Sequence, residues 1–229
     1  MTFKPMLSID QVKAILKPQL EYLAKSTGEM LWMHSFNVWA ILAKFLFFIQ
    51  RIEDKEKMLM EIAALIHDIG KIKTSNQEIL LGKKSGIVKH TATREEIIEY
   101  LKPIVEAEIL QLKNKDFTAI WQFALHHHLS EEQLKEADIP SFGIYAEIVR
   151  YADWLASMKR IDILKVNQIK NDLYGICDIT LFTVGRFPSP STYLMLDIAS
   201  RKYQSLGWTP IIILDDGIVF IGTEGISLP

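Results

Sequence analysis

The histidines of this chain form an ordered set with two aspartates. The chain has six histidines, at four places: His34, His67, His90 and His126-His127-His128. Asp68 follows His67 directly, and Asp153 completes the series. Imidazole and carboxylate groups suit first-row divalent cations. A carboxylate can bridge two cations, so the set predicts a metal pair that generates hydroxide near neutral pH and clamps a phosphate.

The members of this set differ in how strongly the sequence supports them. His67 and Asp68 are adjacent, and Asp68 is the natural bridge because it has two oxygens and a full negative charge. His34 lies on an apolar stretch and has a core histidine as its alternative. Asp153 has a helix cap or an ion pair as its alternative. His90 has the least regular surroundings.

The histidine run leaves two pairings open. Either His126 and His127 or His127 and His128 would supply two adjacent ligands. We prefer His126 and His127, which leaves His128 to face the solvent or to touch a substrate. The run is internal and follows a helical pattern, so it is not an expression tag.

Lysines surround the HD dipeptide. Lys71 follows in the string His67-Asp68-Ile69-Gly70-Lys71, where it could contact a phosphate oxygen or act as a solvated lysine at a helix end. Residues 71–94 hold six basic residues and one acid, Glu78, a local net charge of +5 in a chain of net charge −2. Such a segment is either a solvated face or a surface that attracts a polyanion. The candidate nucleic-acid contacts are Lys73, Lys83, Lys84 and Lys89.

The elements that must position these residues are mostly helices. Apolar spacing and capping residues predict helices over 8–25, 30–52, 54–69, 93–101, 116–129 and 141–159. Gly70 would end the third helix, and Pro103 would interrupt the fourth. Residues 71–94 are expected to form a loop or short helices. His67 and Asp68 would then lie in the last turn of a helix, where both side chains can face a shared site.

The pattern changes after about residue 171. A β-branched and aromatic stretch predicts a strand over 179–187, and a helix is predicted over 192–206. Residues 211–214 and 218–221 flank Asp215-Asp216-Gly217, which predicts a hairpin. We therefore expect a mainly α protein with a helical domain over 1–170 and a small strand–helix–hairpin unit over 171–229.

Composition and length exclude some classes of protein. The chain has 229 residues, 49% of them apolar, which is enough for a substantial core. The single cysteine, Cys177, cannot form an intramolecular disulfide and fits a reducing cytoplasm. The N-terminal residues lack the apolar core of a signal peptide. The apolar run 30–49 contains His34 and Lys44, so we expect a buried helix rather than a membrane span.

The series H, HD, H, HH, D resembles the HD superfamily of metal-dependent phosphohydrolases, over roughly residues 30–160. The resemblance implies a helical HD bundle with two divalent cations. One cation would take His34, His67, Asp68 and Asp153; the other would take Asp68, His90 and two histidines of the run. The catalytic residues would be His67, Asp68 and Lys71. Mixed nitrogen and oxygen ligands favour Mn, Ni, Co, Fe or Zn over Mg.

Within that superfamily, the chain resembles the CRISPR-associated HD nucleases through Ala152-Asp153-Trp154-Leu155-Ala156-Ser157. The tail with Gly207-Trp208-Thr209-Pro210 is similar to the segment after the HD region in the large subunit of type I-D CRISPR effector complexes. This implies a cytoplasmic nuclease that prefers single-stranded DNA and binds other effector subunits, and a chain that is either a fragment or a stand-alone protein. The alternatives are a small-nucleotide phosphohydrolase and a non-catalytic docking module.

Overall fold

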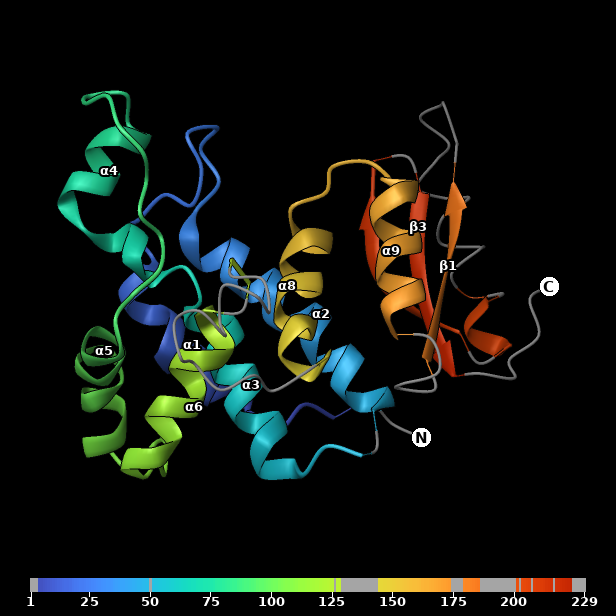
Figure 1. The fold of residues 1–229 in the computed structure, drawn as a ribbon, viewed down its shortest axis with the longest axis horizontal. Coiled ribbons are helices and arrows are strands. Elements are labelled where there is room, and N and C mark those ends of the chain that lie inside the picture. The colour runs from blue at the N-terminus through green and yellow to red at the C-terminus, as the bar shows by residue number, and fades with distance from the viewer. Residues whose placement is uncertain are drawn as a thin grey trace.

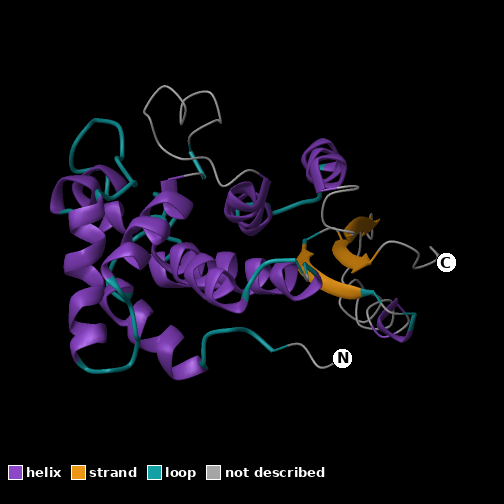
Figure 2. Cartoon of the chain, turned by 60° about the horizontal axis from the view of Figure 1, so that its bottom comes forward, coloured by secondary structure: helices purple, strands orange, loops and turns teal. Residues whose placement is uncertain are grey.

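The structure is a computed structural model, and it describes residues 4–49, 51–125, 127–128, 144–173, 179–185, 201, 203–206, 208–215 and 217–223. Most helices form one side of the molecule, and a small sheet with one helix beside it forms the other (Figures 1 and 2). The mainly α fold class, with a small strand unit near the C-terminus, is therefore confirmed.

The order of elements follows the predicted order, with one additional helix before the first strand. The helices are α1 (Ile9–Leu16), α2 (Leu31–Phe48), α3 (Asp54–Ile66), α4 (Thr74–Leu80), α5 (Arg94–Glu106), α6 (Asn114–Leu125), α8 (Ile144–Ala156) and α9 (Ile163–Leu173). Short 3-10 turns occur at Lys17–Gln19 and Ile69–Ile72. The strands are β1 (Ile179–Gly185), β2 (Thr209–Leu214) and β3 (Gly217–Thr223).

Local capping explains two helix starts. The Ser8 hydroxyl accepts the Gln11 backbone N–H, and the Gln11 side-chain oxygen accepts the Ser8 backbone N–H. These two bonds form a capping box at α1. Thr93 and Glu96 form the same box at α5. Each box satisfies backbone N–H groups that the first helical turn leaves without partners.

Helix α2 is the centre of the helical part. It packs against α3 and α8, and Val38, Leu42 and Phe45 are each fully buried in the core. By length and composition alone α2 could cross a membrane, but more than half of the span is buried inside the protein. Burial by α3 and α8 accounts for its apolar composition, as expected for a core helix.

Several boundaries differ from the predicted ones. Helix α1 ends at Leu16 rather than near residue 25, because Pro18 cannot donate the backbone bond that would continue it. Helix α5 runs through Pro103 to Glu106. The proline loses its own N–H bond, but its carbonyl still accepts the Ala107 N–H at 3.1 Å.

Helix α9 was not predicted. Asp162 accepts the Lys165 N–H at 3.2 Å, and Val166, Ile169 and Leu173 are buried at helical spacing. Both signals are present in the sequence, but α9 has only 11 residues, and lysine and amide side chains separate its apolar positions. The predicted domain boundary at 170/171 falls within this helix, which packs on β1. That division into domains stays a prediction.

The strands form an antiparallel sheet in the order β1-β3-β2. The predicted hairpin is confirmed, since β2 pairs with β3 around a turn that includes Asp215. Most of the predicted helix over 192–206 lies outside the described residues. The partly buried ammonium of Lys44 on α2 donates to the carbonyls of Pro210, at 2.7 Å, and Ile211, at 3.3 Å, and thereby joins the sheet to the helical core.

Candidate metal centre

The HD dipeptide lies in a tight turn between α3 and the 3-10 turn at Ile69–Ile72. His67 is the C-cap of α3, and Asp68 leaves helical geometry with φ −108° and ψ 11°. The prediction placed both residues in the last turn of the helix. In the structure they follow the helix instead. This change of direction lets both side chains face the same interior site, where they are 2% and 4% exposed.

One group of ligand atoms gathers on the α2 side of the turn. Nε2 of His34 lies 3.6 Å from Oδ2 of Asp68 and 3.1 Å from Oδ1 of Asp153. Nε2 of His67 lies 3.5 Å from the same Asp68 oxygen and 3.9 Å from the same Asp153 oxygen. Helices α2, α3 and α8 thus bring together the four residues that the sequence analysis assigned to one cation.

A second group gathers on the α6 side. Single ligand atoms of Asp68, His90, His127 and His128 all lie within 4.8 Å of one another. The ring centroids of His127 and His128 are 3.6 Å apart, and those of His90 and His128 are 4.0 Å apart. The geometry therefore places both His127 and His128 beside Asp68 and His90. His126 lies outside the described residues, so its predicted role as a ligand is not tested.

Asp68 is common to both groups, and its two oxygens face different imidazoles. Oδ2 faces His34 and His67, whereas Oδ1 lies 3.6 Å from Nε2 of His127. Two ligands that each bind one ion at about 2.1 Å in tetrahedral geometry are about 3.4 Å apart. The nitrogen–oxygen separations around Asp68 match that spacing, which suits a carboxylate that bridges two ions.

The imidazoles of His67 and His127 are prepared as ligands by their backbone contacts. Nδ1 of His67 bonds to the carbonyl of Ala64 at 2.8 Å, and Nδ1 of His127 bonds to the carbonyl of Ala124. Because a carbonyl only accepts, each Nδ1 carries the proton and each Nε2 has a free lone pair. Both Nε2 atoms are buried without a hydrogen-bond partner among the described residues. These residues therefore fit divalent cations.

Burial and charge set the protonation of the histidines. Burial lowers the pKa of His67 to about 4, and burial together with neighbouring imidazoles lowers that of His128 to about 3. The pKa of His90 is also lowered, mainly by burial. These rings are thus neutral at pH 7, as metal ligands must be.

The aspartates and His34 form the charged part of the centre. Burial alone would raise the pKa of Asp68, but His67, His127 and Lys71 outweigh it and hold the pKa well below its usual range. Burial would likewise lower the pKa of His34, but Asp153 and Glu29 raise it to about 9. The centre therefore holds ionised carboxylates and a protonated His34 next to the neutral imidazoles of His67, His90 and His128. His34 must lose its proton to bind a cation.

The lysines predicted to meet a phosphate lie in different environments. Lys71 donates to Oδ2 of Asp68 at 2.5 Å, and its side chain is only 12% exposed, unlike a solvated lysine. Lys73 forms an ion pair with Glu96 at 2.6 Å. Lys83, Lys84 and Lys89 are exposed. The cationic surface of this segment is therefore smaller than the sequence charge suggests.

Glu29 is a residue of the centre that the sequence analysis missed. Its Oε1 lies 3.5 Å from Nδ1 of His34, and its Oε2 pairs with Lys25 at 2.8 Å. Carboxylates commonly orient a metal-binding imidazole in this way. Glu29 precedes α2 within a non-helical segment, so no periodic pattern connects it with His34.

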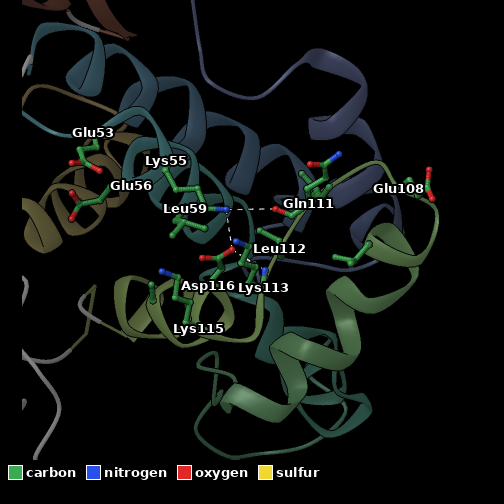
Figure 3. Close-up of a pocket in the computed structure, with 13 residues that line it drawn as sticks. Glu53, Lys55, Glu56, Leu59, Glu108, Gln111, Leu112, Lys113, Lys115 and Asp116 are labelled. Carbon is green, nitrogen blue, oxygen red and sulfur yellow. Dashed lines mark hydrogen bonds and ion pairs between the residues drawn. The ribbon is translucent and has the colours of Figure 1, made fainter.

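A separate cavity of about 940 Å³ lies at the opposite ends of α3 and α6 (Figure 3). Its charges are mixed, because three lysines and four acids line it: Lys55, Lys113, Lys115, Glu53, Glu56, Glu108 and Asp116. Lys55 is also paired with the buried Asp116 at 2.9 Å. The cavity shares no residue with the metal-binding groups, and its balance of charge does not favour a polyanion.

Comparison with known proteins agrees with this geometry. The family model described as HD domain matches residues 31–158, which is more than half of the chain and includes every predicted ligand. Comparisons with curated proteins and with solved structures gave no match. The chain therefore belongs to the HD domain family, whose members are generally metal-dependent phosphohydrolases.

Proposed function

We propose that this chain is a metal-dependent phosphodiesterase that acts as a nuclease and prefers single-stranded DNA. The observation that carries the proposal is the position of Asp68, whose two oxygens face two separate groups of imidazoles. A pair of ions held by one carboxylate is an arrangement suited to in-line displacement at phosphorus. The family assignment supports the broader class of metal-dependent phosphohydrolases.

The residues that hold the cations would be His34, His67, Asp68 and Asp153 on one side, and Asp68, His90, His127 and His128 on the other. Bound divalent cations would supply Lewis acidity toward a phosphate and lower the pKa of water. Asp68 and Asp153 provide negative charge that favours cation binding. Lys71 lies at Asp68, where its ammonium can turn to a non-bridging phosphate oxygen once a cation competes for the carboxylate.

A polynucleotide substrate is supported by the charge next to the centre. Lys89 directly precedes His90, and Lys83 and Lys84 are exposed in the same segment. A nuclease must admit a chain that continues on both sides of the bond it cuts. It therefore needs more basic side chains than the phosphate of one nucleotide can contact. Lys73 is a weaker candidate because Glu96 neutralises it.

The biological setting belongs to the same proposal. The stretch Ala152-Asp153-Trp154 and the hairpin after Trp208 support a role in CRISPR interference, with other effector subunits as partners in the cytoplasm. The hairpin is present in the fold. Copurification with a CRISPR effector complex would test this part independently of the chemistry.

The experiment that tests the function is cleavage of end-labelled single- and double-stranded DNA and RNA with Mn, Ni, Co, Fe, Zn or Mg. We expect internal cuts in single-stranded DNA, best supported by Mn or Ni, and little phosphate release from mononucleotides. His67→Ala should abolish cutting and retain the helical circular dichroism spectrum. The Asp68→Asn variant, purified in the same way, is the control for contaminating nucleases.

Two other results would replace the proposal. Rapid hydrolysis of a mononucleotide without cutting of any polynucleotide would indicate a small-nucleotide phosphohydrolase. A folded protein that binds no divalent cation and cuts nothing would indicate a docking module.

A further inference from the structure

His90 is the ligand with the least regular backbone support. Residues 87–93 belong to neither a helix nor a strand, and His90 is only half-buried. The other histidines of the second group follow the end of α6, whereas His90 has no helix of its own. A ligand on such a segment needs contacts from elsewhere to keep its imidazole near Asp68.

Asn76 on α4 supplies these contacts. Its Nδ2 donates to the carbonyl of Lys89 at 2.6 Å and to the carbonyl of Gly70 at 2.8 Å. Its Oδ1 accepts the Lys89 N–H at 3.1 Å. The side chain is 4% exposed, so water does not compete for these bonds. Asn76 thus binds the residue before His90 and the residue two positions after Asp68.

The same two segments also meet directly. The Gly70 N–H donates to the carbonyl of His90 at 3.0 Å. A Cβ on Gly70 would lie 2.5 Å from that oxygen and 2.6 Å from the carbonyl oxygen of Thr91. The backbones can approach this closely only because residue 70 has no side chain.

We infer that Asn76 is a positioning residue that fixes His90 against Asp68 and so determines how tightly the second cation is held. The inference rests on the proposed metal pair. Among the described residues, Asn76 hydrogen-bonds to no side chain of a predicted ligand, and it acts through the backbone of Lys89 and Gly70. Loss of outer contacts to a metal ligand typically lowers metal affinity about 10- to 100-fold. The first cation, which His34, His67 and Asp153 hold, should not be affected.

The adjacent residue provides a matched control. Gln77 also makes three hydrogen bonds to backbone groups: it donates to Leu23 at 3.0 Å and to Lys71 at 2.8 Å, and it accepts the Leu23 N–H at 3.0 Å. These bonds hold α4 to the segment before α2, not to His90. Gln77→Ala therefore removes similar bonds from the same helix without releasing that ligand.

The test is a titration of the full chain with Mn²⁺ alone, followed by elemental analysis at fixed free Mn²⁺. The wild type should bind two ions. Asn76→Ala should lower the affinity for one ion about 10- to 100-fold and leave the affinity for the other unchanged. Gln77→Ala should retain both affinities, even if its melting temperature falls. Should Asn76→Ala fail to fold, Asn76→Asp keeps the volume and one acceptor and gives the same test.

A second measurement identifies the ligand through which Asn76 acts. His90→Ala should bind the second ion weakly, and addition of Asn76→Ala to it should change nothing further, because residues that act as one unit are not additive. Additive losses, equal weakening of both ions, or unchanged binding in Asn76→Ala would each overturn the inference. A wild type that binds fewer than two ions would instead refute the metal pair itself.

Discussion

Gly70→Ala should displace the backbone of His90, and the structure gives the size of that displacement. The new Cβ would lie 2.5 Å from the His90 carbonyl oxygen, and ordinary contacts begin at 3.4 Å. The His90 backbone must therefore retreat by about 0.9 Å, the difference between these two values. Two of the contacting atoms are backbone carbonyl oxygens, so no side chain can rotate to absorb the change.

A shift of that size should lower the cleavage rate strongly but leave the chain folded. A misplacement of about 1 Å can cost about 100-fold in rate. We expect Gly70→Ala to lower single-stranded DNA cleavage about 100-fold in Mn²⁺, and to lose the second ion before the first. The assays are initial cleavage rates across Mn²⁺ concentrations and elemental analysis of the same samples.

Gly82→Ala is the matched control. Gly82 has φ +70°, so alanine is strained there, but nothing lies within 4 Å of its Cβ. This control should cost about 1–2 kcal/mol of stability, the cost of a left-handed backbone for an L-residue, and leave metal content unchanged. Full activity and two bound ions in Gly70→Ala would refute the reasoning that close backbone contact at residue 70 places His90.

Three further perturbations test other parts of the structure. Asp68→Ala should lose both ions, because each group depends on this carboxylate; full metal content in the variant would contradict the bridge. Replacement of Lys83, Lys84 and Lys89 by Gln should lower the salt slope of single-stranded DNA binding by about 2, at about 0.7 per phosphate contact, and spare hydrolysis of bis-p-nitrophenyl phosphate. The same change at three exposed lysines elsewhere should alter neither: Lys13, Lys17 and Lys102. Glu61 accepts N–H groups from Met6, Leu7 and Trp39, so Glu61→Gln should cost about 1–3 kcal/mol in denaturant unfolding. Burial raises the pKa of Glu61, so its contribution to stability is present below about 4.5 and declines as pH rises through the folded pKa. The cost should therefore be smaller at pH 8 than at pH 4, and a larger cost at pH 8 would contradict that direction.

The sequence predicted the parts of the centre that depend on local pattern. His67 and Asp68 are adjacent, and the helical spacing before them indicated which helix would deliver them. His34 is placed by the same kind of pattern on α2. These metal ligands could therefore be predicted, because residue type and helical spacing are enough to identify them.

The remaining parts depend on contacts between distant segments. Asn76 and Lys89 are 13 residues apart, and no periodic signal connects a helix to an irregular segment. Which histidines of the run face Asp68 depends on where α6 ends, and helix boundaries are the least certain feature of a sequence pattern. The Lys73–Glu96 ion pair also escaped prediction, because charge counting over 71–94 omits acids just beyond the segment.

The contact between Lys44 and β2 has a consequence for how the chain can be divided. The ammonium lies on the central helix of the metal-binding part, whereas both of its carbonyl acceptors belong to the sheet. Burial already lowers the pKa of this lysine. A fragment that ends at residue 170 would remove both acceptors and return this ammonium to water, so the lysine itself would not destabilise the helical part. The cost of that division is instead the surface of α2 that packs on β2 and β3 and would become exposed.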